Sequence, residues 1–361
     1  MKRLKNLLIT LLTRRLVIDF DKNEFVYENL PWKKLKNWFL DELSWVFKTS
    51  KAWAYPTLIQ IEPTNVCNLR CPLCHVVTDN KPRGFMEFKR FKQVMDEIGD
   101  YLLFLHFWGW GEPFLSPDFL KMVRYAKKKG IKIISSTNGH FFRNNEDIDD
   151  LIDSGLDVLI FAIDGLDRET YDKYRKKGDF DRAVSNLRRL LRRRNELNAS
   201  TPVVNLRMLV TRDNEKQVVS MKKFAEEKGV DIFTLKTLCS FDNETTARQI
   251  LPENPDYRRF EYDASGNPIR IKNRCRKPWN HPVIYRDGIV VPCDYHTGDE
   301  FSLGNAFNGN QSNFSRVWFG EAYRSFRARF REKQLKGLRC DSCALNYAYV
   351  DRCVSHAFKI H

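Results

Sequence analysis

The sequence predicts an α/β fold in which a parallel sheet is covered by helices on both faces. From residue 58 onward, short apolar runs rich in Ile, Leu and Val alternate with amphipathic, lysine-rich stretches. Such runs predict strands that are buried on both faces, and the stretches between them predict the covering helices. The chain has 361 residues, of which 42% are hydrophobic, so it is long enough for two domains and apolar enough to fold.

Six strands and five helices are expected in this alternating region. The strands are predicted at 58–62, 101–107, 131–136, 157–163, 203–211 and 231–238. The helices are predicted at 86–98, 117–129, 145–153, 179–195 and 214–228. Ser116 and Pro117 fit the start of the second helix, and Gly130 fits its end. Because sheets of this kind bind ligands at the carboxyl ends of their strands, the functional site is expected in the loops after these strands.

The first 55 residues form a basic amphipathic extension. One face of a candidate helix carries the apolar residues Leu35, Trp38, Phe39, Leu43, Val46 and Phe47. Lysines lie nearby, so the helix could rest on a membrane surface, but the apolar stripe favours packing as a lid or cap. The predicted domains are therefore the extension 1–55, a core 56–240, a Pro- and Gly-bearing linker 241–274 and a cysteine-bearing module 275–361.

The net charge of +15 favours anionic partners or a solvated lysine-rich surface. Acidic lipids, phosphorylated substrates and an acidic redox partner all fit this charge. No apolar run reaches the roughly 18 residues that span a bilayer. The basic and then apolar N-terminus is short and lacks a visible cleavage site, so it is read as uncleaved. We expect a cytoplasmic protein with peripheral contact to the inner face of the membrane.

Three cysteines, Cys67, Cys71 and Cys74, stand in one loop directly after the first strand. Their thiolates could hold three irons of a [4Fe-4S] cluster and leave the fourth iron open for another ligand. Half of a zinc site or a chance group of buried thiols would be the alternatives. Metal binding by these cysteines predicts a reducing compartment.

The spacing Cys67-x3-Cys71-x2-Cys74 resembles the signature of the radical S-adenosylmethionine (SAM) enzymes. In that family the open iron binds SAM, and the reduced cluster splits SAM to give a 5′-deoxyadenosyl radical that takes a hydrogen atom from the substrate. The resemblance implies a partial (β/α)6 TIM-type barrel over 56–240, which accounts for six strands instead of the usual eight. It also implies a reductant of the flavodoxin or ferredoxin type.

A glycine-rich segment after the second strand is similar to the family's GGEP segment, whose backbone meets the amino group of SAM. Its residues are Gly109, Trp110, Gly111, Glu112 and Pro113. Trp110 replaces the first of the paired glycines, which is the one departure from the pattern. An ordinary glycine turn is the alternative interpretation.

The other candidate SAM contacts follow the later strands. They are Ser136, Thr137, Asn138, Asp164, Arg175 and Arg207, with Thr211 as a weaker candidate. Asp164 matches the acidic residue of the family's SIDG segment, although Ala162 stands where serine is usual. Arg175 matches a recurrent arginine that can face the SAM carboxylate, and a surface cation is its alternative.

The C-terminal module resembles the SPASM/twitch extension of radical SAM enzymes, which holds auxiliary clusters. Its candidate ligands are Cys275, Cys293, Cys340 and Cys343, with Cys353 in addition. Four ligands predict one auxiliary [4Fe-4S] cluster, as in aminocyclitol dehydrogenases. Cys353 could replace a ligand, be a spare or face the active site. A zinc ribbon remains an alternative, since two cysteine pairs also suit tetrahedral zinc.

Cys239, at the end of the sixth strand, could be a buried inert thiol or a hydrogen-atom donor near the barrel mouth. The expected function is the oxidation of a small polar, phosphorylated, sugar-like or lipid-linked substrate. A maturase of ribosomally made peptides is the second hypothesis. A zinc-bearing nucleic-acid binding protein is a third, but it leaves the GWGEP and TNG segments unexplained, so nucleic acid is not an expected partner.

Overall fold

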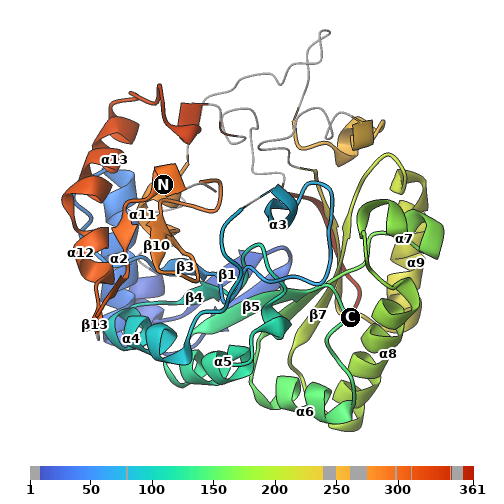
Figure 1. The fold of residues 1–361 in the computed structure, drawn as a ribbon. Helices are drawn as coiled ribbons and strands as arrows, with labels where there is room; N and C mark the ends of the chain where they lie inside the picture. The colour runs from blue at the N-terminus through green and yellow to red at the C-terminus, as the bar shows by residue number, and fades with distance from the viewer. Residues whose placement is uncertain are drawn as a thin grey trace.

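A ten-stranded sheet frames the protein in the computed structural model (Figure 1). The structure describes residues 9–78, 80–238, 249–260, 275–296, 299–309, 311–341, 343 and 353–361. The strand order is β11-β10-β9-β3-β4-β5-β6-β7-β8-β14. The six middle strands are mutually parallel, as each of their pairings shows.

These six strands confirm the predicted partial barrel. They are β3 (Leu58–Ile61), β4 (Phe104–His106), β5 (Lys132–Thr137), β6 (Val158–Ala162), β7 (Val203–Leu209) and β8 (Ile232–Lys236). Each one falls within or against a predicted apolar run. Because all six are parallel, their carboxyl ends open at one mouth, where the polar loops gather.

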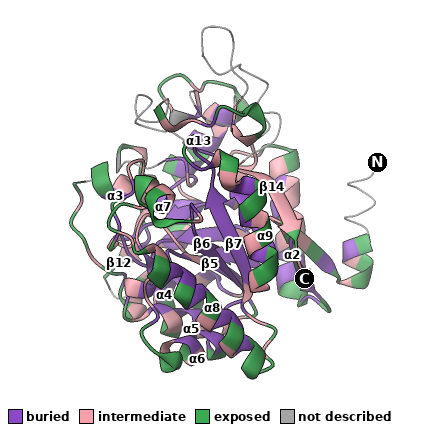
Figure 2. Ribbon diagram, turned by 90° about the vertical axis from the view of Figure 1, so that its right-hand side faces the viewer, coloured by how far each residue is buried: buried purple, intermediate pink, exposed green. Residues whose placement is uncertain are grey.

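The helices that join the strands lie around the outside of the sheet (Figure 1). They are α4 (Phe88–Ile98), α5 (Phe119–Lys128), α6 (Asn145–Asp153), α8 (Phe180–Glu196) and α9 (Val218–Lys228). Their inner faces are buried and their outer faces are exposed (Figure 2). A short helix that the sequence analysis did not predict, α7 (Arg168–Tyr174), begins where the Asp167 carboxylate accepts a hydrogen bond from the backbone N–H of Thr170.

The side chains that point into the barrel change from apolar to polar toward the mouth. Alternate residues such as Ile59 and Leu105 belong to the main core with the helices. The opposite positions at the strand starts, including Phe104 and Ile134, form an apolar floor. Further along the strands the interior-facing positions are polar: Gln60, His106, Ser136, Arg207 and Thr234. The interior next to the mouth is therefore suited to a polar ligand.

A hairpin from the N-terminal extension closes the floor of the barrel. It consists of β1 (Leu16–Phe20) and β2 (Asn23–Tyr27). Phe25 packs edge-on against Phe104, with ring centroids 4.5 Å apart. Asp21, in the hairpin turn, forms an ion pair with Arg207 inside the barrel. The extension thus packs on the barrel, as its apolar content favoured.

The helix α2 (Trp32–Val46) follows the hairpin but buries a different face from the predicted apolar stripe. Its buried residues are Lys34, Leu35, Asn37, Asp41 and Ser44. The Lys34 ammonium donates to the carbonyl oxygens of Leu102, at 2.6 Å, and Gly130, at 3.3 Å. The surface under α2 presents backbone acceptors, so the helix turns polar donors toward it and leaves Val46 and Phe47 exposed.

The C-terminal region adds strands to both edges of the barrel. The strands β9 (Val283–Ile284), β10 (Ile289–Val291) and β11 (Gly304–Asn305) continue the sheet beside β3, while β14 (Val354–Lys359) pairs antiparallel with β8. The remaining elements are α11 (Lys277–Asn280), β12 (Phe307–Asn308), β13 (Gln311–Ser312), α12 (Phe314–Trp318) and α13 (Glu321–Arg331). In the described ranges, no helix has the length and apolar character needed to cross a membrane.

Candidate active site

The cysteine loop lies at the mouth of the barrel, between β3 and the short helix α3 (His75–Thr78). Burial raises the pKa of Cys67 to about 12 and that of Cys74 to about 11. These thiols therefore keep their protons near neutral pH until a metal displaces them. In the part of the chain that the structure describes, no three His, Cys, Asp or Glu residues are arranged to hold a single ion. Three thiols in one loop fit a four-iron cluster, whose ligands lie farther apart than those of one ion.

Polar groups from two other strand ends meet this loop. The Cys74 thiol donates toward the carbonyl oxygen of Trp110, with Sγ 3.7 Å from O. The Asn138 side-chain nitrogen lies 3.9 Å from Cys67 Sγ and donates to the side-chain oxygen of Asn68 at 2.8 Å. The loops after β4 and β5 thus contact the cysteine loop directly, as expected for groups that share one cofactor.

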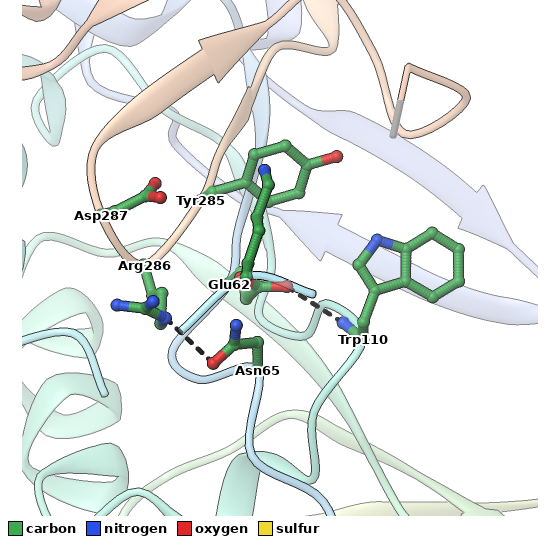
Figure 3. Close-up of a pocket in the computed structure, with 7 residues that line it drawn as sticks. Glu62, Asn65, Trp110, Tyr285, Arg286 and Asp287 are labelled. Carbon is green, nitrogen blue, oxygen red and sulfur yellow. Dashed lines mark hydrogen bonds between the residues drawn. The ribbon is translucent and has the colours of Figure 1, made fainter. Parts of the chain in front are cut away.

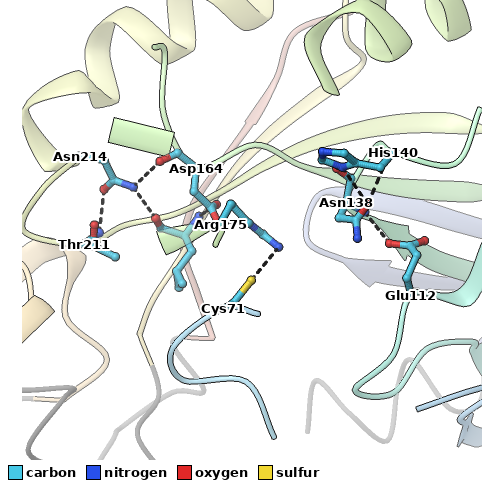
Figure 4. Close-up of polar contacts among 9 residues, drawn as sticks. Cys71, Glu112, Asn138, His140, Asp164, Arg175, Thr211 and Asn214 are labelled. Carbon is cyan, nitrogen blue, oxygen red and sulfur yellow. Dashed lines mark hydrogen bonds and ion pairs between the residues drawn. The ribbon is translucent and has the colours of Figure 1, made fainter. Parts of the chain in front are cut away.

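The side chain of Arg175, the residue that follows α7, reaches Cys71, the remaining cysteine of the loop (Figure 4). Its Nη1 lies 4.0 Å from Cys71 Sγ, and its Nε donates to the buried carboxylate of Asp164. Burial opposes the charge of Arg175, but Asp164 and Cys71 raise its pKa well above the usual range. Asp164 also accepts a hydrogen bond from the backbone N–H of Leu209 at 2.7 Å. The structure therefore places Arg175 as a fixed cation beside the cluster loop and not as a loose surface charge.

Asn214 orders this side of the site, and sequence reasoning missed it. Its side-chain nitrogen donates to the carbonyl oxygens of Asp164, at 2.9 Å, and Leu209, at 2.8 Å. Its side-chain oxygen accepts from the backbone N–H of Thr211 at 2.7 Å. The signal that could have found it is a polar residue three positions beyond Thr211, just after a strand end.

The glycines of the GWGEP segment are required by close backbone contacts. A Cβ atom on Gly111 would lie 2.3 Å from the carbonyl oxygen of Thr64, and one on Gly109 would lie 2.3 Å from the Glu62 carboxylate. Glu112 accepts a hydrogen bond from the backbone N–H of Asn138 at 2.7 Å, and burial raises its pKa to about 7. The segment thus ties the loops after β3, β4 and β5 together, and Pro113 opens the 3-10 turn that follows.

The remaining candidates lie on the barrel wall or beside it. Thr137 Oγ1 accepts from the backbone N–H of Gly139 at 3.1 Å, and Ser136 precedes it on β5. Arg207 donates to Thr234 Oγ1 at 3.0 Å and forms its ion pair with Asp21. The structure gives these residues local partners, and their contacts to SAM remain predictions.

The four candidate ligands of the auxiliary cluster gather beside β9 and β10. They are Cys275, Cys293, Cys340 and Cys343. Burial raises the pKa of each of the first three, to about 12 for Cys275, and Cys343 adds to each of these increases. Four thiols fit a complete ligand set for one four-iron cluster.

His296 stands among these thiols and was not found from the sequence. Its Nδ1 lies 3.2 Å from Cys293 Sγ, and its Nε2 lies 4.0 Å from Cys340 Sγ. Its position three residues after Cys293 was the available signal, but many histidines lie near cysteines by chance. Contact with two of the four thiols makes His296 part of the cluster environment.

The sequence analysis named two further candidate cysteines, Cys353 and Cys239. Cys353 precedes β14, where its Sγ lies 3.3 Å from the Lys236 ammonium at the end of β8. This places Cys353 at the mouth edge of the barrel, and its role as a ligand remains a prediction. Cys239 lies outside the described residues.

Comparisons with known families agree with this geometry. Residues 61–225 match the Radical SAM superfamily, and residues 275–344 match the SPASM family, an iron-sulfur cluster-binding domain. The first match runs from the end of β3 into α9, and the second covers all four auxiliary thiols. The second match favours an iron-sulfur cluster over a zinc ribbon in the C-terminal module.

Individual relatives extend over most of the chain. A tungsten-containing aldehyde ferredoxin oxidoreductase cofactor-modifying protein of Pyrococcus furiosus is 27% identical over 80% of this chain and 88% of its own length. The mycofactocin maturase MftC of Mycolicibacterium smegmatis is 25% identical over 80% of this chain and 75% of its own.

A solved structure shares the fold. Streptococcus suis SuiB bound to S-adenosylmethionine has a TM-score of 0.59 and 17% identity, covering 89% of this chain and 78% of SuiB. SuiB bound to its precursor peptide SuiA has a TM-score of 0.60 and 16% identity, covering 96% and 82%. With the cluster loop, the strand-end contacts and both family matches in agreement, the chain belongs to the radical SAM superfamily and carries a C-terminal SPASM auxiliary-cluster domain.

Proposed function

We propose that this radical SAM enzyme oxidises a small polar substrate and passes an electron to its auxiliary cluster. The observation that carries the proposal is the convergence of four thiols in the C-terminal module: Cys275, Cys293, Cys340 and Cys343. A cluster ligated at all four irons has no open position for a substrate, so electron transfer is the role that remains. An electron acceptor beside the barrel turns hydrogen abstraction into a net dehydrogenation.

The residues at the mouth divide the work of holding the cofactors. Cys67, Cys71 and Cys74 would hold the first cluster, which with bound SAM supplies the radical that removes a hydrogen atom. Arg175, fixed by Asp164, presents a cation on the side of Cys71, where it would pair with the carboxylate of SAM. Buried carboxylates and amides fix the loops around it and exclude water.

The barrel interior supports a polar substrate. His106 Nε2 and Asn205 Nδ2 are buried polar atoms with no hydrogen-bond partner in the described parts of the chain. Such orphaned atoms are rare in folded proteins and mark places where a ligand or water completes the bonding. Burial lowers the pKa of His106 well below its usual value, so the ring is neutral and suits a hydroxyl group. A sugar-like or phosphorylated molecule fits these groups and the basic charge.

A peptide maturase is the second candidate. Its support comes from the relatives, since MftC is a maturase and SuiB binds a precursor peptide. A maturase would be shown by modification of a peptide encoded beside this chain, detected as a loss of two mass units in the purified peptide.

Two partners are proposed on charge and exposure. An acidic flavodoxin- or ferredoxin-type reductant would be attracted by the net charge of +15. Peripheral contact with the inner face of the membrane would use the end of α2, where Val46, Phe47 and Trp53 are exposed beside Lys48 and Lys51.

The test is the iron and sulfide content of protein reconstituted without oxygen. Wild-type protein should hold about eight irons, and a Cys67→Ala/Cys71→Ala/Cys74→Ala variant about four. A Cys293→Ala/Cys343→Ala variant should also hold about four, and Cys353→Ala should keep about eight. Four irons in wild-type protein, or zinc in the C-terminal module, would contradict an electron-accepting cluster and leave only redox-neutral SAM chemistry.

A further inference from the structure

Trp110, the departure from the family's glycine pair, points away from its own loop and joins two parts of the molecule. Its ring contacts the ring of His75, with centroids 4.1 Å apart and planes at 56°. His75 follows Cys74 directly in the chain. The indole is thus one side chain away from a ligand of the first cluster.

The other side of Trp110 meets the auxiliary-cluster region. Trp110 and Tyr285 lie on neighbouring walls of a pocket between the cysteine loop and the β9–β10 turn (Figure 3). Trp110 packs against the apolar cluster that contains Tyr285. The Tyr285 phenol in turn donates a hydrogen bond to the carbonyl oxygen of His296 at 2.8 Å.

His296 closes the connection, because its Nδ1 lies 3.2 Å from Cys293 Sγ. Every step between the two ligand thiols is a covalent link, a side-chain packing contact or a hydrogen bond. The residues in order are Cys74, His75, Trp110, Tyr285, His296 and Cys293.

The connection is held rigidly at its centre. The Glu62 carboxylate accepts a hydrogen bond from the backbone N–H of Trp110 at 3.1 Å. Gly109 has no room for a Cβ because Glu62 fills that space. Trp110 belongs to the same apolar cluster as Tyr285 and Val291. A side chain fixed at its backbone and packed against His75 and this cluster has little conformational freedom left to lose.

We propose that Trp110 and Tyr285 couple the two iron-sulfur centres electronically, an inference that rests on the proposed function and deepens it. Electron tunnelling decays more slowly along bonded and hydrogen-bonded atoms than across a gap. The rings stay closed-shell, because an electron at these low potentials passes by them without oxidising them. Trp110 and Tyr285 are thus positioning residues for electron transfer.

The electrons balance without a further oxidant. SAM cleavage uses one electron from the first centre, and the resulting radical takes one hydrogen atom from the substrate. The substrate radical then loses one proton to solvent or a base and one electron to the auxiliary centre. That electron returns along the route to the first centre. Each turnover removes two hydrogens from the substrate and converts SAM to methionine and 5′-deoxyadenosine, so only a priming electron comes from outside.

The test compares electron redistribution in Trp110→Phe and Tyr285→Phe proteins with wild type. A light-driven reductant adds one electron per chain, and freeze-quench EPR follows its movement between the two centres. The Cys67→Ala/Cys71→Ala/Cys74→Ala variant identifies the auxiliary signal. Tyr27→Phe is the matched control, since Tyr27 is a buried tyrosine of the floor hairpin whose hydroxyl, like that of Tyr285, donates to a backbone carbonyl, here that of Leu103.

Slower redistribution in Trp110→Phe and Tyr285→Phe, with unchanged iron content and midpoint potentials and a wild-type rate in Tyr27→Phe, is the expected result. Wild-type rates in both route variants, with both centres present, would overturn the coupling and leave the proposed function standing. A wild-type protein with a single centre would instead remove the proposed function, and the coupling with it.

Discussion

The Asp164–Arg175 ion pair is buried and holds the guanidinium of Arg175 beside Cys71 of the cysteine loop. The Asp164 side chain is fully buried and that of Arg175 is 17% exposed, so neither ion is well solvated. Replacing Arg175 by Gln would leave a buried carboxylate without its cation. We expect this change to lower the free energy of unfolding by about 3–5 kcal/mol, measured by urea unfolding.

A matched control separates burial from charge. Arg143 pairs with Asp147 on the surface, and its side chain is 72% exposed. Arg143→Gln should cost less than about 1 kcal/mol. Equal losses of unfolding free energy in the two variants would show that the Asp164–Arg175 pair stabilises the chain no more than a surface ion pair does.

Asp41 predicts a pH dependence of stability. It lies on the buried face of α2, where its carboxylate accepts a hydrogen bond from Thr57 Oγ1 at 2.6 Å, and burial raises its pKa to about 7. Its pKa in the unfolded chain is about 3.9. Between these values the folded chain holds a proton that the unfolded chain has lost. The free energy of unfolding therefore falls as pH rises from about 4 to about 7, by up to about 4 kcal/mol for this group.

Asp41→Asn cannot titrate, so its stability should change less than that of wild type across this window. Glu62 and Glu112, whose pKa values burial also raises to about 7, contribute a similar slope in both proteins. The informative quantity is therefore the difference between the two proteins, from urea unfolding at pH 5 and pH 8. Equal slopes would show that Asp41 ionises normally in the folded chain.

Residue spacing in the sequence was enough to predict the candidate cysteine ligands. The other residues of the site were recognised only from their tertiary contacts. The three cysteines of the first loop are recognisable because one turn of chain must place all of them on one cluster. His296, Asn214 and Tyr285 carry no such local signal. Each also contacts a residue that folding brings to it, such as Cys340 for His296.

At the scale of elements, the floor hairpin is a structural closure. Phe25 is 4% exposed and packs on Phe104 within an apolar cluster at the strand starts. Phe25→Ala would leave a cavity that rigid strands cannot collapse to fill. We expect a loss of about 3–5 kcal/mol in unfolding free energy.

Val17 provides the control on the same hairpin. It is 43% exposed, so Val17→Ala should stay within about 0.5 kcal/mol of wild type. Thermal unfolding of the two variants, followed by circular dichroism, compares them directly. Equal and small losses would mean that the hairpin lies on the barrel without sealing it.

The elements that the sequence predicted are those that repeat one physical pattern. Apolar runs between amphipathic stretches located all six barrel strands, because both faces of each strand are buried. The C-terminal strands β9 and β11 are two residues long and show no periodicity. The buried face of α2 was also missed, because backbone carbonyls under it select Lys34 and Asn37 over the apolar stripe.

For the whole molecule, the continuous sheet unites the two cluster regions. Cys67 follows β3, and Cys293 follows β10, which is separated from β3 by β9 alone. A module that merely followed the barrel in sequence could sit anywhere on it. Strand pairing fixes this one beside the first barrel strand, which gives two redox centres a constant separation. The proposed electron exchange between them depends on such a fixed separation.

The exposed aromatic rings at the end of α2, together with the net positive charge of the whole chain, predict that this surface binds a membrane. Phe47 and Trp53 are 63% and 47% exposed, and their rings lie 5.8 Å apart. Exposed lysines flank them, and the whole chain carries a net charge of +15. Aromatic rings insert at the headgroup level of a bilayer, while lysines attract anionic lipid, by about 1 kcal/mol each near the surface.

Cosedimentation with vesicles tests this surface. Wild-type protein should sediment with vesicles that contain phosphatidylserine, and binding should weaken as salt is added because the attraction is screened. Phe47→Ser/Trp53→Ser should reduce binding, because serine cannot enter the bilayer. Val219→Ser should not, since Val219 is 80% exposed but lies on α9. Equal binding of all three proteins would show that the end of α2 is a solvated surface, and equal binding to uncharged vesicles would show that the lysines add no attraction.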